Sequence, residues 1–158
     1  MNNPFLRFKH YRLSEESGAD SKENHATECL AACLVFSPAI RKEFIRFLFD
    51  GQVPFDASLL ETIDVVTQEK INDCDIPDLQ LRCGKEPNIV NVVVEAKVGS
   101  CEREDQFQRY RDWLGEKGFL FSLVRDPDLT LEALEACGVR KRFTWQKWIE
   151  WITCLEQN

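Results

Sequence analysis

The chain lacks the long uncharged segments that would place it in a membrane. No run in its 158 residues approaches the ~20 apolar residues that a transmembrane helix needs. The start of the chain, residues 1–10, also has no apolar core of signal-peptide length. We therefore expect a cytoplasmic protein that has no membrane partner.

The sequence also lacks the cysteine spacing of a disulfide framework or a zinc knuckle. Its seven cysteines are odd in number, scattered, and form no C-x-x-C pair. Cys29 and Cys33 lie one helical turn apart with His25 nearby, but they stand in an apolar run, which gives a shared metal little support. We expect buried, reduced thiols.

Positive charge is scarce. The chain has 20 Lys and Arg against 27 Asp and Glu, a formal charge of −7. Because phosphate contacts need Lys and Arg, this balance counts against a broad non-specific nucleic-acid surface. A carboxylate cluster lessens the conflict, since the cations that it binds neutralise it. Local basic clusters also occur, at Arg103, Arg109 and Arg111 and at residues 140–142.

What is present is the composition of one globular domain. The chain is 44% hydrophobic and 30% charged, and its length is enough to bury a core. It contains no repeat or low-complexity segment. Residues 1–20 are polar, so we predict a flexible lead-in or short cap there, followed by a single domain at residues 21–158.

Hydrophobic spacing predicts an α/β domain whose central mixed sheet has four strands flanked by helices. Ser37 and Pro38 predict a helix start, because serine is a good N-cap and proline is tolerated at the first helical position. The predicted helices span 21–36, 39–49, 102–116, 129–137 and 144–155, and the predicted strands 59–71, 75–83, 89–98 and 119–124.

Two of these strands bring acidic and basic side chains together. Successive side chains of a strand alternate faces, so Glu95 and Lys97 point the same way while Val94 and Ala96 point the other. Gly, Pro and Asn at positions 84–88 predict a turn that makes Asp78 a cross-strand neighbour of Glu95. Two carboxylates and an ammonium at one strand pair are typical of a divalent-metal site.

A further carboxylate stands in the first helix. Glu28 is the only charged residue between positions 26 and 40, and a carboxylate in a core is costly unless it is paired or binds a cation. Each acid has a simpler reading: Glu28 as a partly exposed helix position, and Asp78 as a turn residue beside Pro77. Asp75 fits a turn or a supporting partner, and Glu95 with Lys97 fits an ion pair on a solvated strand.

The order of these motifs resembles the PD-(D/E)XK nuclease superfamily. Pro77-Asp78 matches its PD element, and Glu95-Ala96-Lys97 matches E-x-K. Residues 23–28, E-N-H-A-T-E, look like the E-N-x-x-T-E opening helix of one branch, and Gln106 with Tyr110 looks like its Q-x-x-x-Y element. The resemblance covers residues 21–125 and implies a restriction-endonuclease-like αβββαβ core.

The resemblance implies metal-dependent hydrolysis of phosphodiester bonds. Asp78, Glu95 and the Ala96 carbonyl would bind Mg²⁺ or Mn²⁺, since oxygen-only ligands suit hard cations. Lys97 would orient or deprotonate the attacking water, and Glu28 would complete the site or recruit a second metal. Gln106 and Tyr110 share a helix face and would position Lys97 or the scissile phosphate.

The leading hypothesis is therefore a DNA endonuclease, in keeping with related effectors of prokaryotic antiviral defence. The alternative is a catalytically inactive member kept as a nucleic-acid- or protein-binding module. A third is an unrelated α/β interaction protein. Trp145, Trp148 and Trp151 on the last helix are read as scaffold, with a homo-oligomer, or a place in a larger protein or complex, as a further expectation.

Overall fold

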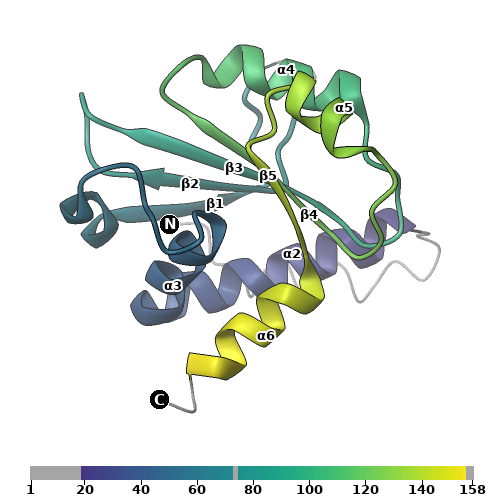
Figure 1. The fold of residues 1–158 in the computed structure, drawn as a ribbon. Helices are drawn as coiled ribbons and strands as arrows, with labels where there is room; N and C mark the ends of the chain where they lie inside the picture. Colours follow the sequence, from purple (N-terminus) through teal and green to yellow (C-terminus); the bar gives the residue numbers. More distant parts are fainter. Residues whose placement is uncertain (1–18, 73–74, 156–158) are drawn as a thin grey trace.

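The computed structural model describes residues 19–72 and 75–155 and consists of a mixed sheet between two layers of helices (Figure 1). The predicted lead-in, residues 1–20, lies outside the described residues except for its last two, which begin the first helix. The elements are α2 (Ala19–Phe36), α3 (Pro38–Leu48), the 3-10 helix η1 (Ala57–Glu61), β1 (Ile63–Thr67), β2 (Leu79–Cys83), β3 (Val90–Lys97), α4 (Glu104–Leu114), β4 (Phe119–Val124), α5 (Leu131–Ala136), β5 (Lys141–Thr144) and α6 (Trp145–Leu155).

The sheet has five strands in the order β1-β2-β3-β4-β5. β1, β2 and β3 pair antiparallel, whereas β3, β4 and β5 pair parallel through the crossover helices α4 and α5. The predicted α/β class and mixed sheet are confirmed. The predicted count of four strands is wrong, because β5 is a further strand of four residues placed directly before α6.

The hydrophobic residues of the sheet face two separate cores. One core lies under α2, α3 and α6 and includes Leu34, Phe44, Val94 and Trp148. The other lies under α4 and α5 and includes Val93. Alternate residues of β3 therefore point to opposite layers, as its valine-rich sequence predicts.

Two local predictions are confirmed by backbone geometry. Ser37 caps α3, since its hydroxyl accepts a hydrogen bond from the Ile40 amide at 3.2 Å, and Pro38 is the first helical residue. Gly84 begins the turn between β2 and β3 with φ +100°, and a Cβ there would lie 2.8 Å from the Asn88 carbonyl oxygen. This turn sets the β2–β3 register on which the site depends.

The second strand is shorter than predicted, because residues 75–78 precede β2 instead of forming part of it. The expectation of buried thiols is also wrong for four of the six described cysteines. Cys83 and Cys137 are buried, and the exposed ones are Cys29, Cys33, Cys101 and Cys154. Among the described residues, no helix combines the length and the apolar character that crossing a membrane requires.

Candidate functional site

Asp78 and Glu95 lie side by side at the end of the β2–β3 strand pair that is opposite the connecting turn. Leu79 pairs with Val94, so the next step of the register places Asp78 beside Glu95. Asp78 is 9% exposed and Glu95 is 2% exposed. The Ala96 amide donates a hydrogen bond to Asp78 Oδ2 at 2.9 Å, which fixes the carboxylate against β3. The predicted cross-strand neighbourhood is confirmed.

Lys97 is paired with Glu95 on the same face of β3. Its ammonium lies 2.6 Å from Glu95 Oε1, and the Lys97 side chain is only 11% exposed. An ion pair this deeply buried is costly to break, because removing one partner leaves the other charge in a poorly hydrated place. The alternative of an ion pair on a solvated strand is therefore wrong in one respect: the pair exists, but it is not solvated.

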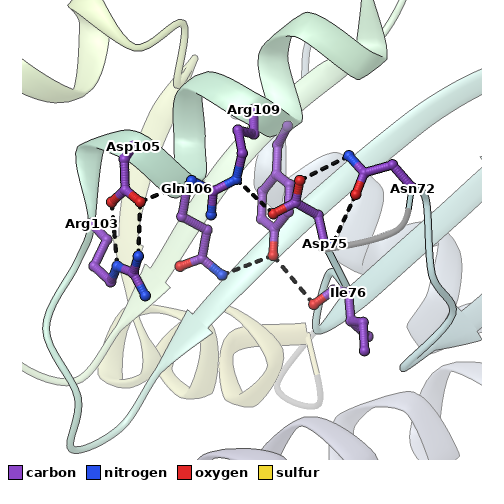
Figure 2. A network of polar contacts seen from close by, with 8 residues as sticks. Asn72, Asp75, Ile76, Arg103, Asp105, Gln106 and Arg109 are labelled. Carbon is purple, nitrogen blue, oxygen red and sulfur yellow. Dashed lines mark hydrogen bonds and ion pairs between the residues drawn. The ribbon is translucent and has the colours of Figure 1, made fainter.

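Gln106 and Tyr110 of α4 hold the chain segment that precedes β2. The Tyr110 hydroxyl donates to the Ile76 carbonyl at 3.2 Å and accepts from Gln106 Nε2 at 2.8 Å (Figure 2). Burial raises the pKa of Tyr110, and the nearby Glu95 carboxylate raises it further. The hydroxyl therefore stays protonated and anchors the backbone two residues before Asp78.

Asp75 is the buried centre of a hydrogen-bond network beside this anchor. Its carboxylate accepts hydrogen bonds from Arg109 Nε and Asn72 Nδ2, each at 2.8 Å, and its amide donates to Asn72 Oδ1 (Figure 2). Burial alone would raise the pKa of Asp75, but the bonds from Arg109 and Asn72 outweigh it and hold the pKa below its ordinary value. Asp75 thus ties α4 to the segment that carries Asp78.

Glu28 is carried by α2, which packs on the opposite face of the sheet from α4 (Figure 1). Its side chain is fully buried, so the reading of Glu28 as a partly exposed helix position is wrong. Among the described residues, no group of three or more His, Cys, Asp or Glu side chains is arranged to hold a metal ion. The assignment of Glu28 to a metal site stays a prediction.

No family model, curated protein or solved structure matches this chain.

Polar residues at one level of the sheet form a row across three strands and the segment before β2. Glu95 of β3 pairs with Ser122 of β4, and Ser122 pairs with Arg142 of β5. With Asp78 before β2, the row runs Asp78, Glu95, Ser122, Arg142, on the face covered by α4. A polar row inside an otherwise apolar layer marks this level of the sheet as the candidate site.

Sequence reasoning missed Glu102, which closes this row at its β5 end. Its buried carboxylate accepts hydrogen bonds from Ser122 Oγ at 2.6 Å, Arg142 Nη1 at 3.1 Å and the Leu129 amide at 3.3 Å. Glu102 stands in a run of charged residues before α4 and gave no signal in the sequence. It joins the segment after β3 to the segment after β4.

Most residues of the basic clusters found in the sequence form ion pairs with acidic residues of the same chain. Arg109 bonds Asp75 and Asp105, Arg103 bonds Asp105, and Arg142 bonds Glu102. Arg111 bonds a carbonyl oxygen, that of Gly118. These clusters therefore act within the fold more than as an open phosphate-binding surface.

Proposed function

We propose that this chain is a metal-dependent nuclease of the PD-(D/E)XK type that hydrolyses phosphodiester bonds in DNA, and that it acts in the cytoplasm. The observation that carries the proposal is the Asp78–Glu95–Lys97 arrangement. A carboxylate from the segment before β2, a carboxylate from β3 and a lysine from β3 lie together and are largely buried. Buried charges of this kind are concentrated at functional sites.

The residues suit a hard cation by their chemistry. Asp78 and Glu95 supply carboxylate oxygens and Ala96 supplies a backbone carbonyl, donors that Mg²⁺ or Mn²⁺ prefers. Such an ion, when bound, stabilises the charge on a phosphoryl oxygen and lowers the pKa of a bound water. Lys97 would exchange its ion pair with Glu95 for a contact to the attacking water. Glu28, on α2 at the opposite face of the sheet, is not needed for this ligand set, and its part in a second metal site stays a prediction.

Tyr110 takes a different role in this proposal from the one that the motif implies. Its hydroxyl is buried and bonded to the Ile76 carbonyl, so it positions Asp78 through the backbone. Gln106, which is only partly buried, is then the member of the pair that could contact a phosphate. In this proposal Tyr110 supports the site and Gln106 contacts the substrate.

A second candidate function is a binding module that has lost catalysis. The described residues contain no ready three-ligand group, and Lys97 is paired with the carboxylate that a metal would need. In that case the buried charges serve to hold β2, β3 and α4 together. An assay of cleavage and metal binding separates the two functions.

The test compares the wild-type chain with Lys97→Ala on supercoiled plasmid and on labelled single-stranded DNA and RNA. Each substrate is incubated with Mg²⁺, Mn²⁺ or EDTA. We expect cleavage that requires the metal and that falls at least ~100-fold in the variant, since proton transfer typically contributes that much. Lys117→Ala, which removes an exposed lysine between α4 and β4, is the matched control and should cleave like wild type.

A folding check keeps this result interpretable. Lys97→Met retains the apolar stem, and circular dichroism of both Lys97 variants shows whether the buried Glu95 disrupts the fold when it is left alone. Titration with Mn²⁺ is compared between wild type and Asp78→Asn. A well-folded wild-type chain that neither cleaves nor loses Mn²⁺ affinity in Asp78→Asn would reject the nuclease in favour of the binding module.

A further inference from the structure

The strand β5 ends the sheet and leaves one side of its backbone without a neighbouring strand among the described residues. It pairs only with β4 in the strand order, and it crosses from α5 on one face to α6 on the other (Figure 1). The Arg140 amide bonds the Leu120 carbonyl at 2.8 Å. Backbone groups of a strand alternate sides, so the amides and carbonyls of Lys141 and Phe143 point to the open edge.

A hollow lies on each side of this edge. The hollow on the α6 side has a volume of about 500 Å³ and includes Phe47, Phe143 and Trp151 in its wall. The hollow on the α5 side has a volume of about 530 Å³ and includes Leu131 and Leu134. Each volume lies in the range of sites that bind small groups. Each wall combines apolar side chains with charged ones, including the acids Asp50 and Glu150 on the α6 side and Glu135 on the α5 side.

The edge between the hollows carries three consecutive basic residues, Arg140, Lys141 and Arg142, in a chain of formal charge −7. Lys141 and Lys147 line both hollows. Within residues 19–72 and 75–155, Lys147 has no carboxylate at ion-pair distance, while Lys141 pairs with Asp50 on the surface. Exposed pairs of this kind contribute little, so Lys141 can exchange its partner. The basic residues at this edge thus contrast with the negative net charge of the molecule as a whole.

We propose that β5 is a docking edge for an extended acidic segment of another protein, which adds to the sheet as a sixth strand. Side chains of an added strand alternate faces, so two consecutive apolar side chains would enter the two hollows while flanking acids meet Lys141 and Lys147. The open backbone of Lys141 and Phe143 supplies the main-chain hydrogen bonds. The proposal is independent of the nuclease site.

Charge and shape favour this occupant over two others. A second copy of the chain would bring Lys141 and Lys147 against their own equivalents, and lysine at an edge strand disfavours such self-pairing. A nucleic acid would be attracted by the lysines, but it has no side chain for the hollows and no backbone amide for the strand. A peptide satisfies the backbone, the hollows and the charge together.

The test uses the full chain and a blocked, fluorescein-labelled peptide in which phenylalanine and leucine are flanked on each side by two glutamates. Binding is measured by fluorescence polarisation. We expect Lys147→Glu to weaken binding on the order of tenfold, while Lys117→Glu, the same charge change on an exposed turn, leaves it unchanged. Leu131→Asp should also weaken it, and Ile149→Asp, an exposed residue outside both hollow walls, should not.

Backbone methylation tests the added strand directly. Two further peptides carry N-methyl groups on alternate amides, in opposite phases. Strand addition predicts that one phase abolishes binding, because it removes the amides that face β5, and that the other phase is tolerated. Equal binding of both phases, no binding of the parent peptide at millimolar concentration, or displacement of the peptide by single-stranded DNA would overturn the proposal. A Lys147-dependent dimer in sedimentation, in place of peptide binding, would overturn it as well.

Discussion

At the residue scale, buried carboxylates in this chain are held by specific donors. Asp75 lies between Asn72 and Arg109, and Glu102 lies between Ser122 and Arg142. Each carboxylate joins segments that are far apart in the sequence. A charged hydrogen bond contributes more than a neutral one, so such residues carry much of the specificity of the packing around α4.

Asp75→Asn should lower the free energy of unfolding at pH 7 by about 1–2 kcal/mol, because the amide cannot pair with the Arg109 guanidinium as a carboxylate does. The folded pKa of Asp75 is lowered, so its contribution is complete above the unfolded pKa and is lost as pH falls through the folded pKa. Urea unfolding of both proteins should therefore show a stability difference that is constant near neutral pH and shrinks below about pH 4.

Asp126→Asn is the matched control for this measurement. Asp126 pairs with Arg125 on the surface, and both side chains are mostly exposed. Its substitution should change stability by less than about 0.5 kcal/mol at any pH tested. A stability difference for Asp75→Asn that stays the same down to pH 2 would contradict the proposed charged pair.

At the scale of elements, the points where helices begin and end determine how the helices pack against one another. The break between α2 and α3 depends on Ser37 and Pro38, which end one helix and begin the next. α3 then packs Phe44 and Phe47 against Trp148 of α6, with ring centroids 4.9 and 5.3 Å apart. The reading of this aromatic helix as scaffold is confirmed for Trp148, which is buried.

Ser37→Ala should destabilise the protein by about 1 kcal/mol, because the Ile40 amide loses its only side-chain cap. Thermal unfolding followed by circular dichroism measures the change. Ser37→Asn, which keeps a side-chain acceptor, should retain most of the stability. If the two variants melt together, the hydroxyl does not act as a cap.

Local signals predicted several elements, whereas long-range contacts decided the rest. The run at residues 119–124 predicts β4 with its observed bounds, because five of its six residues are apolar and suit a buried strand. β5 was missed because its four residues include Lys141 and Arg142 and gain their strand geometry from pairing with β4. Residues 75–78 were predicted to lie within a strand, but Asp75 is bonded to Asn72 in a turn.

The candidate site was also predictable only in part, because local signals place some of its residues and long-range contacts place the others. Strand alternation and a turn are enough to bring Asp78, Glu95 and Lys97 together. The burial of Tyr110 and the role of Glu102 depend on α4 and on the segment after β4, which are placed by tertiary packing. No spacing rule links residue 102 to residue 142.

At the scale of the whole molecule, the six described cysteines divide into two classes by burial. Burial raises the pKa of the Cys83 thiol to about 12, so very little thiolate exists near neutral pH. Cys137 is buried in the core under α4 and α5. The other four described cysteines are exposed to solvent.

Iodoacetamide treatment of the native protein at pH 8 should therefore modify the exposed thiols and spare Cys83 and Cys137. Peptide mapping by mass spectrometry identifies the modified sites. In guanidinium chloride both protected cysteines should react, which shows that the fold and not the reagent limits them. Rapid native labelling of Cys83 would mean that the sheet opens far more readily than its packing implies.

Thr144 ends β5 and Trp145 begins α6, so no connecting residue separates the strand from the helix. The Thr144 hydroxyl also accepts a hydrogen bond from the Lys147 amide at 3.2 Å, which stiffens this junction. We therefore expect β5 and α6 to move together as one unit. Three of the four tryptophans in the chain lie on α6. A displacement of the sheet edge should therefore shift these indole rings and change the intrinsic tryptophan fluorescence of the protein, so that no added dye is needed to detect it.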